Sequence, residues 1–63
     1  MSIGRNLMIL MYDKRVSSEE LAKEIDVSPS MISKIINGVK VPSLPKLMKI
    51  AEYLGVTLDE LVR

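Results

Sequence analysis

The stretch SSEELAKEIDVSPSMISKIING, residues 17–38, decides the fold because it predicts two short helices joined by a tight turn. Ser17 followed three residues later by Glu20 is a capping box, the arrangement that begins many helices. Ser28 is a second candidate N-cap, and Pro29 stands at the first helical position, where a missing N–H is tolerated. Only two residues remain between the predicted helices to form the turn.

The apolar residues of this stretch recur at the three-and-four spacing of helices that bury one side. They are Leu21, Ala22, Ile25, Val27, Ile32, Ile35 and Ile36. The opposite side of the second helix carries Ser30, Lys34 and Asn37, flanked by Met31 and Ser33. A helix with small polar groups and one lysine on its free side fits a DNA major groove. A plain amphipathic helix with a solvated side explains the same pattern equally well.

Positive charge is concentrated in the middle of the chain. The formal net charge is only +1, but residues 27–50 contain four lysines and no acidic residue. Residues 1–26 sum to −1 and residues 51–63 to −2. A phosphate backbone would therefore be attracted to the outward helix and the segment that follows it. A solvated surface can carry as many lysines, so the charge supports an anion-facing role without requiring one.

Length and composition exclude several functional classes. A chain of 63 residues forms one small domain, which is marginal by itself unless it dimerises. It contains no cysteine and no histidine, which excludes disulfides, the usual zinc sites, thiol nucleophiles and imidazole acid–base chemistry. No residue set offers a nucleophile with a base, so we expect no enzymatic activity, no cofactor and no metal.

Targeting signals also restrict the function. The apolar run of residues 7–12 is too short to span a bilayer, and the chain shows no signal-peptide pattern. We therefore expect a cytoplasmic protein that does not bind a membrane. We expect no small-molecule ligand either, because the chain has no room for a ligand domain, so control would come from protein concentration, another protein or degradation.

The remaining segments predict three further helices. Residues 2–13 form a helix that is apolar over much of its circumference, with Met8, Ile9 and Tyr12 beside its inner side. These three residues are either a contact surface for a second protein or are covered by loops of the domain, and the second alternative is favoured for Met8 and Ile9 because methionine often fills gaps.

The end of the chain repeats the same kind of helix start. Gly38 fits the left-handed position that ends the outward helix, and Ser43 is expected to cap a fourth helix. Thr57 begins a last helix that is too short to be stable alone and must pack on its own domain or on a partner copy. The prediction is an all-α domain over residues 1–63, with helices at residues 2–13, 18–25, 29–37, 44–54 and 58–62.

The whole chain resembles the Cro and phage-repressor (XRE-like) family of helix-turn-helix domains. The resemblance is carried by SSEELAKEIDVSPSMISKIING and by PSLPKLMKIAEYLGVTLDEL. It implies a lambda-repressor-like fold of five short helices, with the helix-turn-helix at the second and third, in a prokaryotic or phage protein. It also implies binding to double-stranded DNA and transcription regulation, usually as a homodimer.

The resemblance further implies roles for individual residues. The recognition helix would read bases through Pro29, Ser30, Met31, Ser33 and Lys34. Lys34 would donate to guanine, Met31 would contact a thymine methyl, and Pro29 could contribute only apolar contact or shape. The residues implied to contact the DNA backbone are Ser18, Ser28, Asn37, Lys40, Ser43 and Lys46. The dimer interface would contain Val41, Leu58 and Val62, with the first helix as the rival surface.

Two departures from the family pattern affect the expected structure. Asp26 stands in the turn where glycine is common, an acceptable change because aspartate tolerates left-handed geometry. Many relatives bury an ion pair between the first and recognition helices at the positions that here hold Met11 and Ile36. Replacing both charges by apolar groups can be neutral or stabilising, so we expect Met11 and Ile36 to touch.

The sequence therefore predicts a sequence-specific transcriptional regulator, and more specifically a repressor that binds a palindromic operator as a homodimer through residues 29–37. The alternative is a protein-interaction module with the same fold that acts on another regulator. The low total charge and the apolar side of the first helix favour that alternative.

Overall fold

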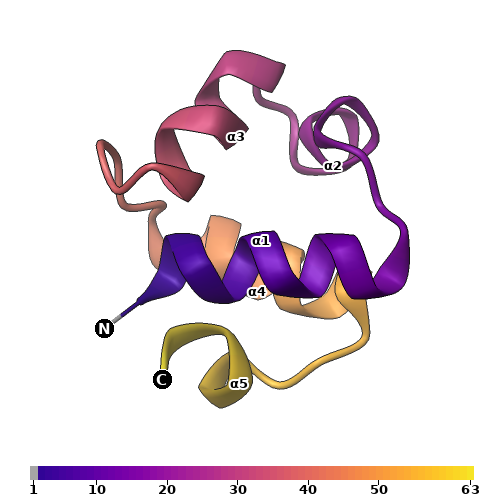
Figure 1. Ribbon diagram of the computed structural model, residues 1–63, viewed down its shortest axis with the longest axis vertical. Helices are drawn as coiled ribbons and strands as arrows, with labels where there is room; N and C mark the ends of the chain where they lie inside the picture. The colour runs from indigo at the N-terminus through magenta and orange to yellow at the C-terminus, as the bar shows by residue number, and fades with distance from the viewer. Residues whose placement is uncertain (1) are drawn as a thin grey trace.

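The computed structural model describes residues 2–63, and every regular element within them is a helix. The helices, in chain order, are α1 (Ile3–Lys14), α2 (Ser18–Ile25), α3 (Pro29–Ile36), α4 (Leu44–Leu54) and α5 (Leu58–Val62). In Figure 1, α2 and α3 lie on one side of α1 and α4, and α5 lies on the other. The predicted all-α fold with five helices is confirmed, and the helix bounds differ from the predicted ones by at most one residue.

Side-chain caps begin three of the helices. The hydroxyl oxygens of Ser17, Ser28 and Thr57 accept hydrogen bonds from backbone amides three residues later, at 3.0, 3.2 and 3.1 Å. Ser43 is the N-cap residue of α4, as predicted, but its side chain makes no such hydrogen bond. Pro45, in the first turn of α4, has no N–H to donate, but the Lys46 amide, three residues after Ser43, is present, so nothing in the sequence accounts for the missing bond.

Left-handed residues end the helices. Asp26 follows α2 with φ of 59°, as expected from its place in the turn. Gly38 follows α3 with φ of 77°, which confirms its predicted left-handed conformation. Arg15 adopts φ of 58° after α1, an uncommon conformation for a residue with a side chain. Its amide donates to the Tyr12 carbonyl at 3.2 Å, which ties the end of α1 to the chain entering α2.

One hydrophobic core joins all five helices. Its buried members are Ile3, Leu7, Met11, Leu21, Ala22, Ile25, Ile32, Ile35, Leu47, Ile50, Ala51, Leu54 and Leu61. Ile36 is partly buried and packs against this core, to which Met11 also belongs. Both residues therefore contribute to the hydrophobic core, and direct contact between their side chains stays a prediction.

Polar contacts between distant segments fix how the helices sit on the core. The Tyr53 hydroxyl of α4 donates to the Glu20 carboxylate of α2. Within residues 2–63, Glu20 thus serves Tyr53 rather than the Ser17 amide that a complete capping box would supply. The Asn6 side chain of α1 donates to carbonyls at the end of α5.

None of the described helices is long and apolar enough to cross a membrane.

Candidate nucleic-acid interface

The outward side of α3 is polar and open to solvent. Ser30, Ser33 and Lys34 are exposed, whereas Ile32 and Ile35 on the opposite side are buried. Pro29 is also exposed, at the first position of the helix, where its ring presents no donor. The arrangement leaves a helix side with small hydroxyl groups and one long cationic donor, which is the chemistry that can contact base edges.

The small polar groups of this surface are paired with one another. The hydroxyl oxygens of Ser28 and Ser30 are 3.3 Å apart, and the Asn37 side-chain amide donates to the Ser33 hydroxyl at 3.5 Å. Lys34 differs from them, because within residues 2–63 its ammonium group has no hydrogen-bond or ion-pair partner. Lys34 is therefore the long donor of α3 that is free to bind a ligand.

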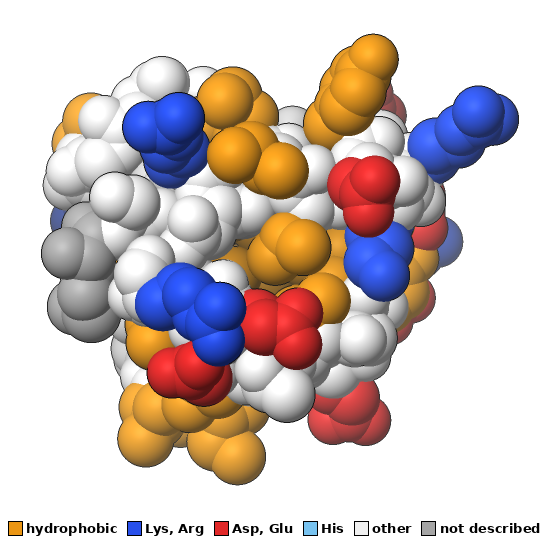
Figure 2. Space-filling view, turned by 60° about the horizontal axis from the view of Figure 1, so that its bottom comes forward, with side chains coloured by type: hydrophobic (Ala, Val, Ile, Leu, Met, Phe, Trp, Pro, Cys, Tyr) orange, Lys and Arg blue, Asp and Glu red, His pale blue; other side chains and the backbone are white. Residues whose placement is uncertain are grey.

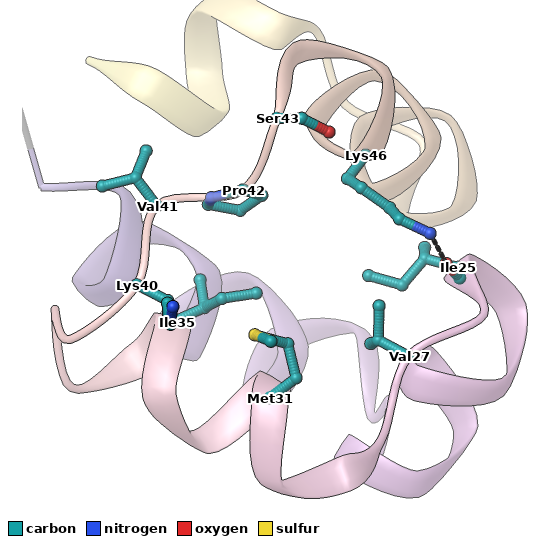
Figure 3. Close-up of a pocket in the computed structure, with 9 residues that line it drawn as sticks. All are labelled: Ile25, Val27, Met31, Ile35, Lys40, Val41, Pro42, Ser43 and Lys46. Atoms are coloured by element: carbon teal, nitrogen blue, oxygen red, sulfur yellow. Dashed lines mark hydrogen bonds between the residues drawn. The ribbon is translucent and has the colours of Figure 1, made fainter.

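Met31 does not share the outward side. It is partly buried, packs against the core and lines a pocket with Val27 and Ile35 (Figure 3). Its position one turn before Ile35 explains this, since residues four apart in a helix lie on the same side. Its predicted contact with a thymine methyl stays a prediction.

The pocket lies between α3, the loop after it and the first turn of α4, and has a volume of about 190 Å³. Figure 3 shows Lys40, Ser43 and Lys46 around it, with apolar side chains between them. These three were predicted as DNA-backbone contacts, and the structure brings them together beside α3. No acidic residue lines the pocket. The charged residues of the lining, Lys40 and Lys46, are therefore both cations, set among apolar side chains.

Lys46 has a second role that the sequence did not predict. Its ammonium nitrogen donates to the Ile25 carbonyl at the end of α2, at 2.6 Å. A cation at this place also favours the negative end of the helix dipole. The two residues are far apart in sequence, so no local pattern could have revealed the contact. Lys46 joins α4 to α2 and keeps two further N–H groups for other partners.

The N-termini of α2 and α4, where the implied phosphate contacts Ser18 and Ser43 lie, differ in charge. The first turn of α2 begins with Ser18, which is partly exposed, and contains Glu19 and Glu20. The first turn of α4 contains no acidic residue, and its N-cap Ser43 leaves the amides without a side-chain acceptor. Backbone amides at a helix start attract anions, and nearby carboxylates oppose that attraction. The electrostatics at the start of α4 therefore favour an anion more than those at the start of α2.

The residues predicted for a dimer interface fall into two groups. Val41, in the loop before α4, is 72% exposed, whereas Leu58 and Val62 of α5 are partly buried against the core. Sequence reasoning missed Leu44 and Met48, two large apolar residues of α4 that are each more than half exposed. Their four-residue spacing outside the inner stripe of α4 was the signal that could have found them.

A separate apolar surface lies on α1. Met8 and Ile9 are 50% and 52% exposed, and Tyr12 is 88% exposed. The expectation that loops of the domain cover Met8 and Ile9 is wrong for the part of the chain that the structure describes, because the connecting loops run elsewhere. Figure 2, which turns the α5 end toward the viewer, shows hydrophobic side chains interspersed with acidic and basic ones on that face.

Few of the charged groups are engaged with one another. The ion pair found within residues 2–63 joins the Arg63 guanidinium to the Asp59 carboxylate at 2.7 Å, and this contact raises the pKa of Arg63. The hydrogen bond to Glu20 raises the pKa of Tyr53 to about 12. Both contacts involve residues outside the lysine-rich segment, so Lys34 and Lys40 keep their charge available.

Comparisons with known proteins identify relatives of this chain. The profile of a helix-turn-helix family matches residues 13–61. The chain is 34% identical over 62 residues to the HTH-type transcriptional activator BcrR of Enterococcus faecalis, and the match covers 98% of this chain and 30% of that protein. It is 41% identical over 59 residues to Control protein C.MunI of Mycoplasma sp, with 92% of this chain and 80% of that protein covered.

Proposed function

The chain belongs to the helix-turn-helix family of DNA-binding transcription regulators, and from this premise we propose that it is a repressor that binds a palindromic operator as a homodimer. The observation that carries the proposal is the exposed polar side of α3, with an unpaired Lys34, next to lysines that have no acidic neighbour along the chain. Bases and phosphates could be contacted together from this one side of the molecule.

Base reading is assigned to the first two turns of α3. Lys34 would donate to the O6 and N7 atoms of guanine, and the hydroxyls of Ser30 and Ser33 would make shorter contacts. Pro29 can supply only apolar contact. Because the helix offers a single long donor, part of the sequence preference would come from the shape and deformability of the DNA.

Contacts to the DNA backbone are assigned to the segment after α3. Asn37, Lys40 and Ser43 are exposed, and the uncapped amides at the start of α4 lie beside Lys46. Ser28 and Ser18 complete the proposed set from the starts of α3 and α2. We rank Ser18 last, since the acidic first turn of α2 weakens attraction to phosphate.

A homodimer would place two copies of α3 in successive major grooves, about 34–36 Å apart along one side of the DNA. The proposed interface consists of Val41, Leu58 and Val62, extended by the exposed Leu44 and Met48 of α4. Repression would follow where the operator overlaps a promoter, because the bound dimer excludes polymerase. A dimer bound upstream of a promoter would use the same contacts to activate.

The test is selection of bound sites from random DNA, followed by binding measurements on the selected site and on a random duplex. Lys34→Ala should weaken binding to the selected site by about 1–3 kcal/mol and relax the base preference at one position. Lys40→Ala should weaken binding to both duplexes alike and lower the salt dependence by about one counterion.

Lys49→Ala is the matched control for these two variants. It removes the same charge from an exposed position, but Lys49 lies beside Glu24 and Glu52, away from α3. We expect near-normal binding. Equal losses on specific and random DNA for Lys34→Ala and Lys40→Ala would contradict the proposed division of roles.

A second candidate function is supported by the exposed apolar surface of α1. Met8, Ile9 and Tyr12 could bind another regulator, and such a module would not need DNA. A gel shift on random duplex at low salt distinguishes the two functions, since a pure protein-interaction module should produce no shift.

A further inference from the structure

A single side chain of α1 holds the end of α5. The Asn6 amide nitrogen donates to the Leu61 carbonyl at 2.9 Å and to the Arg63 carbonyl at 2.7 Å. The last carbonyls of a helix have no partner inside the helix, and here a residue more than 50 positions away in sequence supplies the donors. Both N–H groups of the amide are used for this contact.

α5 depends on such contacts because it contains only five residues. A helix of this length does not form stably alone. Leu61 anchors it in the core, and the Thr57 hydroxyl caps its start. Asn6 fixes the other end, and thereby sets the direction in which Leu58 and Val62 are presented, the two residues of α5 in the proposed dimer interface.

The same turn of α1 also contacts the recognition helix. Gly4 lies so close to the end of α3 that a Cβ atom built on it would be 2.4 Å from the Ile36 carbonyl oxygen. Asn6 follows Gly4 by two residues. The end of α3 and the end of α5 are thus both held by the first two turns of α1, which makes this part of α1 a rigid spacer between them.

We propose that Asn6 is a positioning residue that sets the distance between the two recognition helices of the dimer. The inference rests on the proposed function. Asn6 acts through α5: it holds Leu58 and Val62 at a fixed angle to α3, and the dimer then accepts one spacing between operator half-sites. Without the two hydrogen bonds, α5 frays, dimerisation weakens and neighbouring spacings become acceptable.

The test compares the wild-type chain with Asn6→Asp, which keeps the shape of the side chain but replaces its donors by acceptors. Sedimentation equilibrium should show the dimer dissociation constant raised at least about tenfold, because two hydrogen bonds are lost and a carboxylate then faces two carbonyl oxygens. Site selection from a library of palindromes with variable spacers should return one spacing for the wild type and several for the variant. Affinity for a single half-site should change less than twofold.

Two further variants complete the design. Asp13→Asn makes an opposite isosteric change at an exposed position of α1 and should behave as wild type. Asn6→Gln keeps the amide donors on a side chain one methylene longer and should recover part of the self-association. Amide hydrogen exchange should show faster opening of α5 in Asn6→Asp while α2 and α3 stay protected, which distinguishes local fraying from general unfolding.

The outcomes separate the two proposals. A normal dimer constant, a normal spacing preference and normal exchange of α5 in Asn6→Asp would overturn the role of Asn6 and leave the proposed function standing. Wild-type protein that selects no DNA would overturn the proposed function, whereas the dimer constants and the exchange of α5 would still decide whether Asn6 holds the interface. A wild type that stays monomeric while binding single half-sites would overturn both the proposed homodimer and the role of Asn6, and would leave DNA binding by α3 standing.

Discussion

The α2–α3 pair is held by contacts between close neighbours in sequence, whereas the α1–α5 pair is held by contacts between the two ends of the described chain. α2 and α3 each begin with a serine cap, and Asp26 closes the turn between them in a left-handed conformation. α5 receives its final hydrogen bonds from Asn6. The difference teaches that α2 and α3 are encoded locally, whereas the position of α5 depends on a contact between distant parts of the chain.

The largest expected effect concerns how α1 packs on α3. Met11→Arg should place an unpaired charge in the core, where Met11 is buried, and lower the free energy of unfolding by about 3–5 kcal/mol. The double variant with Ile36→Glu should recover most of the loss if the two side chains touch. Urea unfolding followed by circular dichroism measures both.

Met8→Arg is the control for this pair, because Met8 lies on the exposed side of the same helix. Its effect should stay within about 0.5 kcal/mol. A double variant no more stable than Met11→Arg would show that Met11 and Ile36 do not meet.

A smaller effect is expected at the close approach of α1 to α3. In Gly4→Ala the new methyl group would lie 2.4 and 2.5 Å from the Ile36 and Ile35 carbonyl oxygens, so the helices must separate. Overpacking costs about 1–3 kcal/mol, which exceeds the gain of at most ~1 kcal/mol that alanine brings to a helix. Thermal unfolding should show the loss, and Arg5→Ala at the next position should not. Unchanged stability would contradict the described contact.

Two serines at helix starts, Ser17 and Ser43, differ in whether their side chains cap the helix. Ser17→Ala removes the bond to the Glu20 amide and should cost about 1 kcal/mol of unfolding free energy. Ser43→Ala removes no capping bond and should cost less than about 0.5 kcal/mol. Both are measured by urea unfolding under the same conditions. Equal losses would mean that Ser43 caps α4 in solution.

The smallest effect is a pH dependence of the α2–α4 contact. In the folded protein the pKa of the Tyr53 hydroxyl is raised from its ordinary value of 10.0 to about 12, because the hydroxyl donates a hydrogen bond to Glu20. Since the folded-state pKa is raised, the contact stabilises the fold fully below pH 10 and is lost as the pH rises toward 12. Phenolate absorbance in a Tyr12→Phe background measures the titration, and Glu20→Gln should bring it back toward the ordinary value. A Tyr53 that already titrates near 10.0 would contradict the contact.

Predictions from the sequence succeeded where the physical cause spans a few residues. The spacing of Ser17, Ser28 and Thr57 from the amides they cap predicted where three helices begin, and the apolar period separated the buried Ile32 from the exposed Lys34. Ser43 stands at the predicted N-cap position of α4 but makes no side-chain capping bond, which its spacing could not reveal. Met31 was predicted to flank the outward side of α3. It is partly buried, because it lies four residues before Ile35 and therefore on the same side of the helix.

The sequence by itself determined the five helices, their order, the polar outward side of α3 and the acid-free lysine segment, because propensity, capping and periodicity act over one or two turns. Only the tertiary structure decided that Lys46 meets the Ile25 carbonyl, that Asn6 holds α5, and that Leu44 and Met48 stay exposed. The contacts of Lys46 and Asn6 join residues that are distant along the chain, and the exposure of Leu44 and Met48 depends on how the helices pack. Their geometry exists only after the core has brought the helices together.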